Sequence, residues 1–594
     1  MWFLLLLWVS GPKNTIDPEL LHALKARSIG PAGMSGRVTA LAVPSHLPET
    51  LYLGAATGGV WKSTNGGLSF QPIFDDQPVH AIGAIAVHEQ VNDHVWVGTG
   101  EGNVRNSTSI GAGVFRSLDG GKTWSCVGLE KTERINKILL HPQSTQTAYI
   151  AAMGQLWGEN EERGVYRTTN GGASWSPVLQ VNPSTGATDL AMDPQNPDKL
   201  FAALWQFRRW PHFFKSGGPG SGLYLTYDGG NNWKKLGPEQ GLPDGELGRI
   251  AVAIAPSNHQ IVYALIESKQ SGLYKSEDGG QHFTLINSKS DIADRPFYYH
   301  RIVVDPQDAH RVYLVQTLVR VSEDGGKSFQ TLSGASWPNI HVDYHAMWVD
   351  PLHPNRMYVG NDGGVAESRD YGKSFRFISN LPLAQFYHIH FDMDQPYHLY
   401  GGLQDNGSWR GPSATNRQGG IRNHLWELVS FGDGFDTVPD PQDSTKGYSM
   451  SQGGNLYRWD IKDGSSQVIM PAAPDGTKLR FNWNSGLALD PFQPGTLYYG
   501  SQFVHKSTDK GATWQTISPD LTTNTADWQK QDESGGLTID VTAAENYTTL
   551  VTIAPSPIKE GLIWVGSDDG RIHVTQDGGT TWTSVESGLK GVGK

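Results

Sequence analysis

Two histidines and an aspartate alternate along one short stretch of the chain, in the segment NIHVDYHAMW. They are His341, Asp343 and His345. In an extended strand, residues spaced by two point to the same side, and two imidazoles with a carboxylate suit a divalent metal. The segment therefore predicts a possible divalent metal site. The competing interpretation is a set of polar side chains that line a wet channel. The sequence indicates no other cofactor.

Three long segments rich in aromatic and arginine side chains form a second candidate site. They are GEGNVRNSTSIGAG, MGQLWGENEERG and WQFRRWPHFFKSGGPGSG. Aromatic rings offer stacking faces and arginines offer forks for carboxylates or other anions, so these segments predict a groove for a sugar chain or an extended peptide. The competing interpretation is that the aromatics pack the loops onto each other. We call this set the loop wall, and its predicted ligand-binding residues are Glu101, Arg105, Trp157, Glu162, Arg163, Trp205, Arg208, Arg209 and Trp210.

The elements that must position these residues follow from an eight-residue box that occurs nine times. SLDGGKTW begins at Ser117, SEDGGKSF at Ser322 and TQDGGTTW at Thr575. The hydroxyl and carboxyl groups of such a box can bond the backbone of their own turn, glycine tolerates positive φ, and the closing aromatic residue begins a strand. We interpret the box aspartates as locks of hairpin turns and not as catalytic carboxylates.

A second signature precedes the boxes at a steady distance. It is an apolar run that ends in a Pro or Asp turn and is followed by an aromatic strand, as in LALDPFQPGTLYYG. Each unit thus contains four short antiparallel strands, and repetition of such a unit is the signature of an all-β fold, the β-propeller. We predict a lead-in at residues 1–29, a seven-bladed ring at 30–382 and about four blades of a second, apparently incomplete ring at 383–594. A single ring of ten or eleven blades is the alternative.

Composition limits the partners and the cellular address. The net charge is −12 and has no long runs of one sign, which argues against a nucleic-acid partner. The apolar stretch from Trp2 to Val9 is too short to span a bilayer but suits a signal peptide, so we predict a secreted or periplasmic protein without a transmembrane segment. Four blades would leave unpaired strand edges, so a partner chain or further blades should complete the second ring.

The box resembles the Asp-box, or BNR, repeat of sialidases, sortilin-type Vps10 propellers and tandem-propeller xyloglucanases. Stretches such as SIGPAGMSGRVTALAV, SGGPGSGLY and VGSDDGRIHVTQDGGTTW are similar to those of exported bacterial sortilin-like or glycosyl-hydrolase-like proteins. Members of that group are usually longer, so the resemblance implies further blades.

The resemblance also implies where catalytic carboxylates would stand. Xyloglucanases use two aspartates across a cleft between two propellers, one of them in a T-D-x-G-G turn of the first blade. The matching stretch here is A-A-T-G-G, which puts Ala56 at the expected aspartate position. At related turns, GNDGG and LQDNG supply Asp362 and Asp405, the candidates for acid or base if the chain is a hydrolase.

The main functional prediction from the sequence is an exported binding platform for a glycan or an extended polypeptide. A glycoside hydrolase with altered catalytic residues is the alternative, and a scaffold or assembly protein is a further one. A hydrolase predicts two carboxylates in one cleft, whereas a binding module predicts an aromatic platform without such a pair.

Overall fold

The computed structural model describes residues 24, 26–335, 340–473, 475–542 and 544–588. The predicted signal-like stretch from Trp2 to Val9 lies outside these residues. Within them, no helix is long and apolar enough to cross a membrane. The helical segments that the described residues do form are single 3-10 turns, namely η2 (Glu130–Thr132), η3 (Pro238–Gln240), η4 (Ser290–Ile292), η5 (Asn423–Leu425), η6 (Gln452–Gly454), η7 (Ala526–Trp528), η8 (Gln531–Glu533) and η9 (Glu586–Gly588).

The first part of the chain folds into seven successive antiparallel sheets, which we call the N-terminal body. In chain order, their strands are β1 (Val38–Ala42), β2 (Leu51–Ala55), β3 (Val60–Ser63), β4 (Gln71–Pro72); β5 (Ile82–His88), β6 (Val91–Thr99), β7 (Val114–Ser117), β8 (Ser125–Cys126); β9 (Ile135–Leu140), β10 (Ala148–Ala152), β11 (Gly164–Thr168), β12 (Ser176–Leu179); β13 (Thr185–Met192), β14 (Leu200–Trp210), β15 (Phe213–Ser216), β16 (Gly222–Thr226), β17 (Lys234–Leu236); β18 (Leu247–Ile254), β19 (Val262–Ser268), β20 (Gly272–Ser276), β21 (Thr284–Asn287); β22 (Arg301–Val304), β23 (Val312–Val315), β24 (Val319–Ser322), β25 (Gln330–Thr331); β26 (Tyr344–Val349), β27 (Met357–Asn361), β28 (Gly364–Ser368) and β29 (Arg376–Phe377).

The rest of the described chain folds into four more sheets, which we call the C-terminal body. Their strands are β30 (Phe386–Phe391), β31 (His398–Leu403), β32 (Gly407–Pro412), β33 (Glu427–Ser430); β34 (Gly434–Asp440), β35 (Asp443–Ser451), β36 (Asn455–Asp460), β37 (Ser465–Val468); β38 (Leu487–Leu489), β39 (Leu497–Gly500), β40 (Val504–Ser507), β41 (Gln515–Thr516); β43 (Leu550–Pro555), β44 (Ile563–Ser567), β45 (Ile572–Thr575) and β46 (Thr583–Ser584). Apart from the sheet that β14 enlarges, every sheet pairs its four strands in chain order, so the predicted all-β propeller fold is confirmed.

The boxes lock the hairpins as their residue types predict. In the box at Ser322, the hydroxyl donates to Asp324 at 2.8 Å and accepts the backbone N–H of Gly326 at 2.7 Å. Asp324 in turn accepts the backbone N–H and the hydroxyl of Ser328. Gly325 and Gly326 have φ values of 74° and 92°, which favour glycine. The turn is therefore closed by its own side chains.

Replacing Ser322 with alanine should destabilise the fold without touching any binding surface. Ser322 is 1% exposed, and loss of its oxygen leaves the buried N–H of Gly326 without an acceptor. Such a loss costs about 1–3 kcal/mol of the free energy of unfolding, measurable by urea titration. Ser333→Ala, in the turn beyond the box, is the matched control; an equal loss in both variants would contradict the role of the box hydroxyl.

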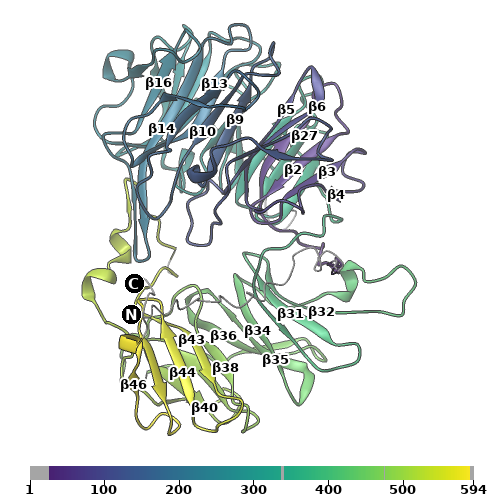
Figure 1. The fold of residues 1–594 in the computed structure, drawn as a ribbon, viewed down its shortest axis with the longest axis vertical. Coiled ribbons are helices and arrows are strands. Elements are labelled where there is room, and N and C mark those ends of the chain that lie inside the picture. Colours follow the sequence, from purple (N-terminus) through teal and green to yellow (C-terminus); the bar gives the residue numbers. More distant parts are fainter. Residues whose placement is uncertain (1–23, 25, 336–339, 474, 543, 589–594) are drawn as a thin grey trace, which may run out of the picture.

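The seventh sheet packs against the first. Val38 and Leu53 of β1 and β2 share one apolar cluster with Tyr358 of β27 and Val365 of β28. The first and seventh sheets are therefore neighbours in space, and the ring boundary near residue 382 stays a prediction. In Figure 1 the N-terminal body, purple to teal, lies above the C-terminal body, green to yellow.

A hairpin from the N-terminal body reaches the C-terminal body. β15 pairs in parallel with β42 (Gly535–Gly536), which precedes the last sheet. Arg209 forms a buried ion pair of 2.8 Å with Asp540, and the ring of His212 stacks on Trp528. The hairpin and the segment around β42 therefore tie the two bodies together beside the gap between them, where Figure 1 shows the blue hairpin descending towards the yellow segment.

Candidate functional site

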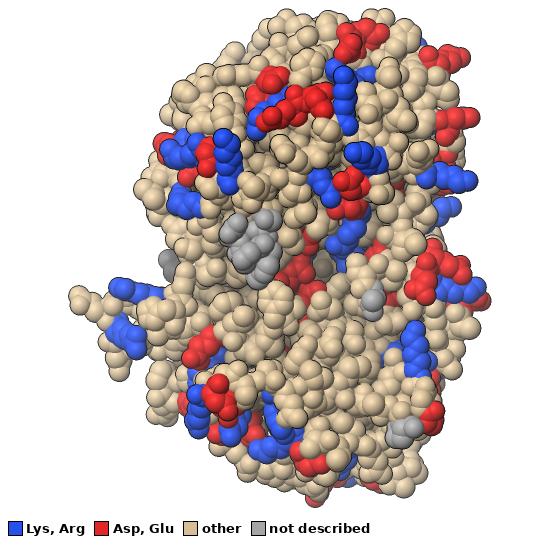
Figure 2. Space-filling model, turned by 180° about the vertical axis from the view of Figure 1, so that it is seen from behind, with Lys and Arg blue, Asp and Glu red and all other residues tan. Residues whose placement is uncertain are grey.

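A cavity of about 440 Å³ lies between the two bodies. Its wall from the N-terminal body includes Arg37, Arg105, Asn106, Ser107, Arg295, Tyr298 and Asp343, and its wall from the C-terminal body includes Tyr387, Gln404, Asp405, Asp433, Phe435, Gln452, Asn482, Trp483 and Asn484. Figure 2 shows acidic and basic side chains together in the hollow between the bodies. This mixture of aromatic rings and convergent polar groups is typical of a ligand site.

The carboxyl groups of the site come from corresponding loops of neighbouring sheets. Asp362 follows β27 and Asp405 follows β31, so each lies in the connection after the second strand of its sheet. Asp343 and Asp433 each lie just before the first strand of a sheet, β26 and β34. In a propeller, these two kinds of connection lie on the same face. The repeat therefore gathers four carboxyl groups from residues far apart in sequence.

Asp362 is fully buried at the centre of a hydrogen-bond network. One carboxylate oxygen accepts Nε of Arg37 at 3.0 Å and faces Nε2 of His345 at 2.7 Å. The other accepts the hydroxyl of Tyr298 at 2.5 Å and Nε2 of Gln404 at 3.0 Å. Burial alone would raise the pKa of Asp362, but the charges of Arg37 and His345 outweigh it and hold that pKa well below its ordinary value. Asp362 is therefore ionised.

Asp405 has the opposite electrostatic character. Burial, reinforced by the charges of Asp433 and Asp362, raises the pKa of Asp405 well above its ordinary value. Its carboxyl group is hydrogen-bonded to Asp362, and its backbone N–H donates to Asp433 at 2.8 Å. Burial likewise raises the pKa of Asp433. The site thus pairs Asp405, whose surroundings at the cavity wall favour its protonated form, with Asp362, whose surroundings favour the carboxylate. Two carboxyl groups with pKa values driven apart are the mark of an acid and its partner.

Backbone strain gathers at the same place. Arg295, Asp343 and Asp405 have φ values of 84°, 64° and 57°, in the left-handed region that residues other than glycine seldom adopt. All three line the cavity. Strained residues cluster at functional sites because the surrounding structure must hold them there. This strain is independent support for a site in the cavity.

Arginines and aromatic rings shape the rest of the wall. The guanidinium of Arg105 lies 5.1 Å from the ring centroid of Trp483 and 5.5 Å from that of Tyr298. Arg295 lies on the same Tyr298 ring, at 5.1 Å. The ring of Tyr387 stacks on Phe435 at 4.3 Å. These contacts hold the cationic groups in fixed positions.

The structure brings the predicted Asp362 and Asp405 together, but only one of the two lines the cavity. Asp405 lines the cavity, whereas Asp362 is 0% exposed and lies behind the wall. One oxygen each of Asp343, Asp362 and Asp405 lie within 4.8 Å of one another. This spacing is tighter than the roughly 6.5–9.5 Å between the carboxyl groups of inverting glycosidases. Ala56, the position to which the resemblance assigns an aspartate, is 1% exposed, lies beside Leu383 and is not among the residues that line the cavity.

The residues of the loop wall are mainly buried. Among them, all of which the structure describes, only Trp157 is exposed, at 42%. Arg163 donates to three backbone oxygens, and Trp205 stacks on Phe207. Arg105 is the wall residue that lines the cavity. The placement of the others is as follows: Glu101 is buried against Arg37, Arg209 is buried against Asp540, and Glu162, Arg208 and Trp210 are half-buried.

The predicted metal ligands do not meet at one point. β26 begins at Tyr344, and the positive φ of Asp343 interrupts the extended backbone on which the alternation depends. His345 faces Asp362, and Nδ1 of His341 lies 2.7 Å from the backbone oxygen of Val342. Among the described residues, the group of possible metal ligands at this place is Asp343, Asp362 and Asp405, without either histidine. Asp362 is already hydrogen-bonded there to Arg37, Tyr298 and Gln404, faces Nε2 of His345, and is hydrogen-bonded to Asp405.

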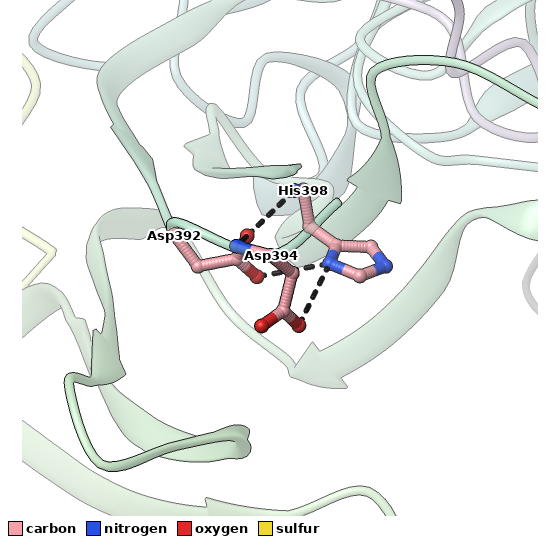
Figure 3. A group of neighbouring side chains, drawn as sticks. All are labelled: Asp392, Asp394 and His398. Carbon is pink, nitrogen blue, oxygen red and sulfur yellow. Dashed lines mark hydrogen bonds and ion pairs between the residues drawn. The ribbon is translucent and has the colours of Figure 1, made fainter. Parts of the chain in front are cut away.

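A second group of possible ligands, Asp392, Asp394 and His398, has a structural explanation (Figure 3). Asp392 accepts the backbone N–H groups of Asp394 and His398 and the hydroxyl of Tyr400. In the corresponding turn of a later sheet, Asp490 likewise accepts the backbone N–H two residues on, from Phe492, and the tyrosine hydroxyl eight residues on, from Tyr498. Nη2 of Arg410 also lies 3.1 Å from Nε2 of His398, where a cation would be repelled. The group is therefore a turn lock.

The site residues that the sequence analysis did not identify differ in how far the sequence could have pointed to them. Asp433 lies between two glycines in FGDGF, just before a strand, and this local pattern could have identified it. Arg295, Tyr298 and Trp483 have no local signal, because they reach the cavity only through the arrangement of the sheets.

Comparisons with known proteins agree with this fold. A family model described as "Sortilin, neurotensin receptor 3" matches residues 112–241. The chain is 24% identical over 404 residues to a xyloglucanase of Hypocrea jecorina, and this alignment covers 64% of this chain and 38% of that protein. It is 22% identical over 240 residues to an oligoxyloglucan-reducing end-specific xyloglucanase of Emericella nidulans, covering 35% of this chain and 28% of that one. The aligned chain thus spans less than half the length of these relatives.

A solved structure has the same architecture over almost the whole chain. The crystal structure of an ancestral GH74 enzyme superposes with a TM-score of 0.57 at 15% sequence identity, and the match covers 94% of this chain and 78% of that one. At this identity the likeness establishes the fold alone.

Proposed function

We propose that this chain, an Asp-box β-propeller protein related to the xyloglucanases, carries a glycoside hydrolase site in the cavity between its two bodies. The observation that carries the proposal is the pairing of Asp405, protonated and at the cavity wall, with Asp362, ionised and buried behind it. A protonated carboxyl group can donate its proton to a glycosidic oxygen as the bond breaks. The sequence relationship to xyloglucanases supports a polysaccharide substrate.

In this proposal each residue has a distinct task. Asp405 is the general acid. Asp362 is a positioning residue, because it touches no cavity and instead orders Tyr298 and Gln404, which do line it. The second carboxyl group is Asp343 or Asp433, the other carboxyl-bearing residues of the cavity wall among those described. Trp483 and Tyr387 supply ring faces on which sugars stack.

Release of reducing sugar from a panel of β-glucans, xyloglucan included, tests the proposal directly. We expect turnover by the wild-type protein, loss of turnover in Asp343→Ala or Asp433→Ala, and rescue by azide in the variant that lacks the second carboxyl group. Azide replaces a missing carboxylate, so the rescued variant identifies that residue. If no glycan in the panel is cleaved, the hydrolase assignment is wrong.

A glycan-binding platform without catalysis is the second candidate. The close spacing of Asp343, Asp362 and Asp405, within 4.8 Å, favours it, since an inverting pair needs room for a water molecule. Glycan binding by calorimetry without sugar release would select this candidate. Under both candidates we propose a location outside the cytoplasm, where polysaccharides are found.

A further inference from the structure

The sheets of this protein pack on one another through two faces that repeat along the chain. We call the face turned toward the preceding sheet the leading face, and the face turned toward the following sheet the trailing face. On each trailing face the second strand carries an aromatic ring, which is paired across the sheet with the residue ten positions earlier. These rings are Tyr52, Trp96, Tyr149, Phe201, Tyr263, Tyr313, Tyr358, Tyr400, Tyr448, Tyr498 and Trp564.

The trailing ring ordinarily packs on the next sheet of the chain. The hydroxyl of Tyr149 donates to the backbone oxygen of Gly229 in the next sheet at 2.9 Å, and that of Tyr263 donates to Ala309 in the next sheet at 2.9 Å. Ten of the rings are at most 3% exposed, whereas Trp564, on β44 of the last sheet described, is 45% exposed. Trp564 therefore has the place of a buried interface ring without a described sheet to cover it.

The first sheet of the C-terminal body leaves its leading face open in the same way. Ile389 of β30 is 64% exposed, and Phe391 and Leu428 on the same face are 64% and 50% exposed. Buried residues at the position equivalent to Ile389 in other sheets are Ile138, Leu190, Val252, Ile302, Thr437, Leu487 and Ile553. Exposed apolar patches of this kind mark interaction surfaces.

The chain itself shows what covers such a leading face. Ile138 of the third sheet lies in one apolar cluster with Trp96 and Val114 of the second sheet. Trp96 is the trailing ring of that second sheet. A leading face therefore packs against a trailing face with an aromatic ring at its centre, which is the surface that the last sheet offers at Trp564.

We propose that a second copy of this chain covers both faces, so that the leading face of each copy packs on the trailing face of the other. Ile389 of one copy then meets Trp564 of the other, as Ile138 meets Trp96 within the chain. The four sheets of each C-terminal body together form a ring of eight, which lies within the usual size range of propellers. A two-fold axis closes this ring, because each copy supplies one face of each kind.

The two faces favour a copy of this chain over an unrelated partner. An unrelated protein would need an aromatic trailing face at one end and an apolar leading face at the other, and a second copy has both. In Figure 1 the first sheet (β31, β32) and the last sheet (β44, β46) lie at opposite sides of the C-terminal body. Pairing would remove Ile389, Phe391, Leu428 and Trp564 from water, which favours association by about 25 cal/mol per Å² of apolar surface.

Sedimentation equilibrium of the full chain tests the inference. We expect the wild type to have twice the mass of one chain. Ile389→Glu and Trp564→Glu should each weaken self-association about hundredfold or more, because each variant places a carboxylate in both interfaces of the pair. Leu68→Glu, at a side chain 70% exposed in the N-terminal body, is the matched control and should associate as the wild type does. Thermal unfolding shows that each variant is folded.

A mixture of the two variants identifies which faces meet. In a mixed pair, the intact trailing face of the Ile389→Glu copy packs on the intact leading face of the Trp564→Glu copy. One of the two interfaces is thereby restored. We expect the mixture to associate more tightly than either variant does alone.

Several results would overturn the inference. They are a wild type that stays monomeric at its highest soluble concentration, a dimer that either glutamate variant leaves unchanged, a mixture that associates no more tightly than its components, and growth into open filaments. The inference is independent of the proposed hydrolase, whose residues lie in the cavity of a single chain. Sugar release therefore tests that proposal separately.

Discussion

Replacing Asp405 with asparagine should reduce glycan hydrolysis by about 10²–10⁴-fold while leaving the fold intact. The side chain keeps its size and hydrogen bonds but cannot donate a proton to a leaving group. Asparagine also tolerates the φ of 57° at this position, because it is among the residues that accept the left-handed region. Initial rates on the best substrate of the glycan panel measure the effect.

The pH dependence gives an independent check on Asp405. Its folded-state pKa is raised above the unfolded value, so the folded state binds more protons between the two values. Stability should therefore fall as pH rises through that interval, and activity should fall as the acid ionises. Asp405→Asn should be no less stable than the wild type, and should be more stable above that interval. A variant that unfolds, or one that retains full activity, would contradict the role of general acid.

Replacing Asp362 with asparagine should cost about 3–5 kcal/mol of the free energy of unfolding. The substitution leaves Arg37 with one buried carboxylate partner in place of two and deprives His345 of the carboxylate at 2.7 Å. An unbalanced buried charge is more costly than the pair is favourable, since water no longer solvates it. Urea unfolding measures the loss, and Asp76→Asn at an exposed turn should stay within about 0.5 kcal/mol of the wild type.

The contribution of Asp362 to stability should change with pH in the opposite direction from the contribution of Asp405. The folded-state pKa of Asp362 is held well below its ordinary value. Its contribution to stability is therefore complete above the unfolded pKa, near 3.9, and is lost as pH falls through the folded pKa. The wild type and Asp362→Asn should converge in stability at acid pH. A difference that persists unchanged at low pH would show that Asp362 acts by packing and not by charge.

The loops that carry Asp362 and Asp405 place the two carboxyl groups in different surroundings. Asp362 is buried and hydrogen-bonded to Tyr298 and Gln404, whereas Asp405 has a left-handed backbone conformation and lines the cavity. A protonated acid at neutral pH requires neighbours that disfavour its charge, and Asp433 and Asp362 provide them.

The sequence by itself determined the repeating unit of this protein. Ser322, Asp324 and the glycines of each box act within a single turn, so their residue types are enough to predict the hairpin and, by repetition, the propeller. The sequence also marked Asp362 and Asp405, because their turns, GNDGG and LQDNG, are related to the aspartate-bearing turn that the resemblance to xyloglucanases implies.

Only the tertiary structure decided what the site is. The alternation of His341, Asp343 and His345 predicted one face, but the left-handed backbone at Asp343 sends the three side chains to different partners. The loop wall predicted an open groove, but Trp205 is buried inside the N-terminal body and Arg209 is buried against Asp540 of the C-terminal body. Arg37 and Trp483 both line the cavity, and they come together there only because of the way in which whole sheets pack. Local turn chemistry is readable in sequence because it is made by neighbours, whereas burial, pKa and cavity shape are set by residues hundreds of positions apart.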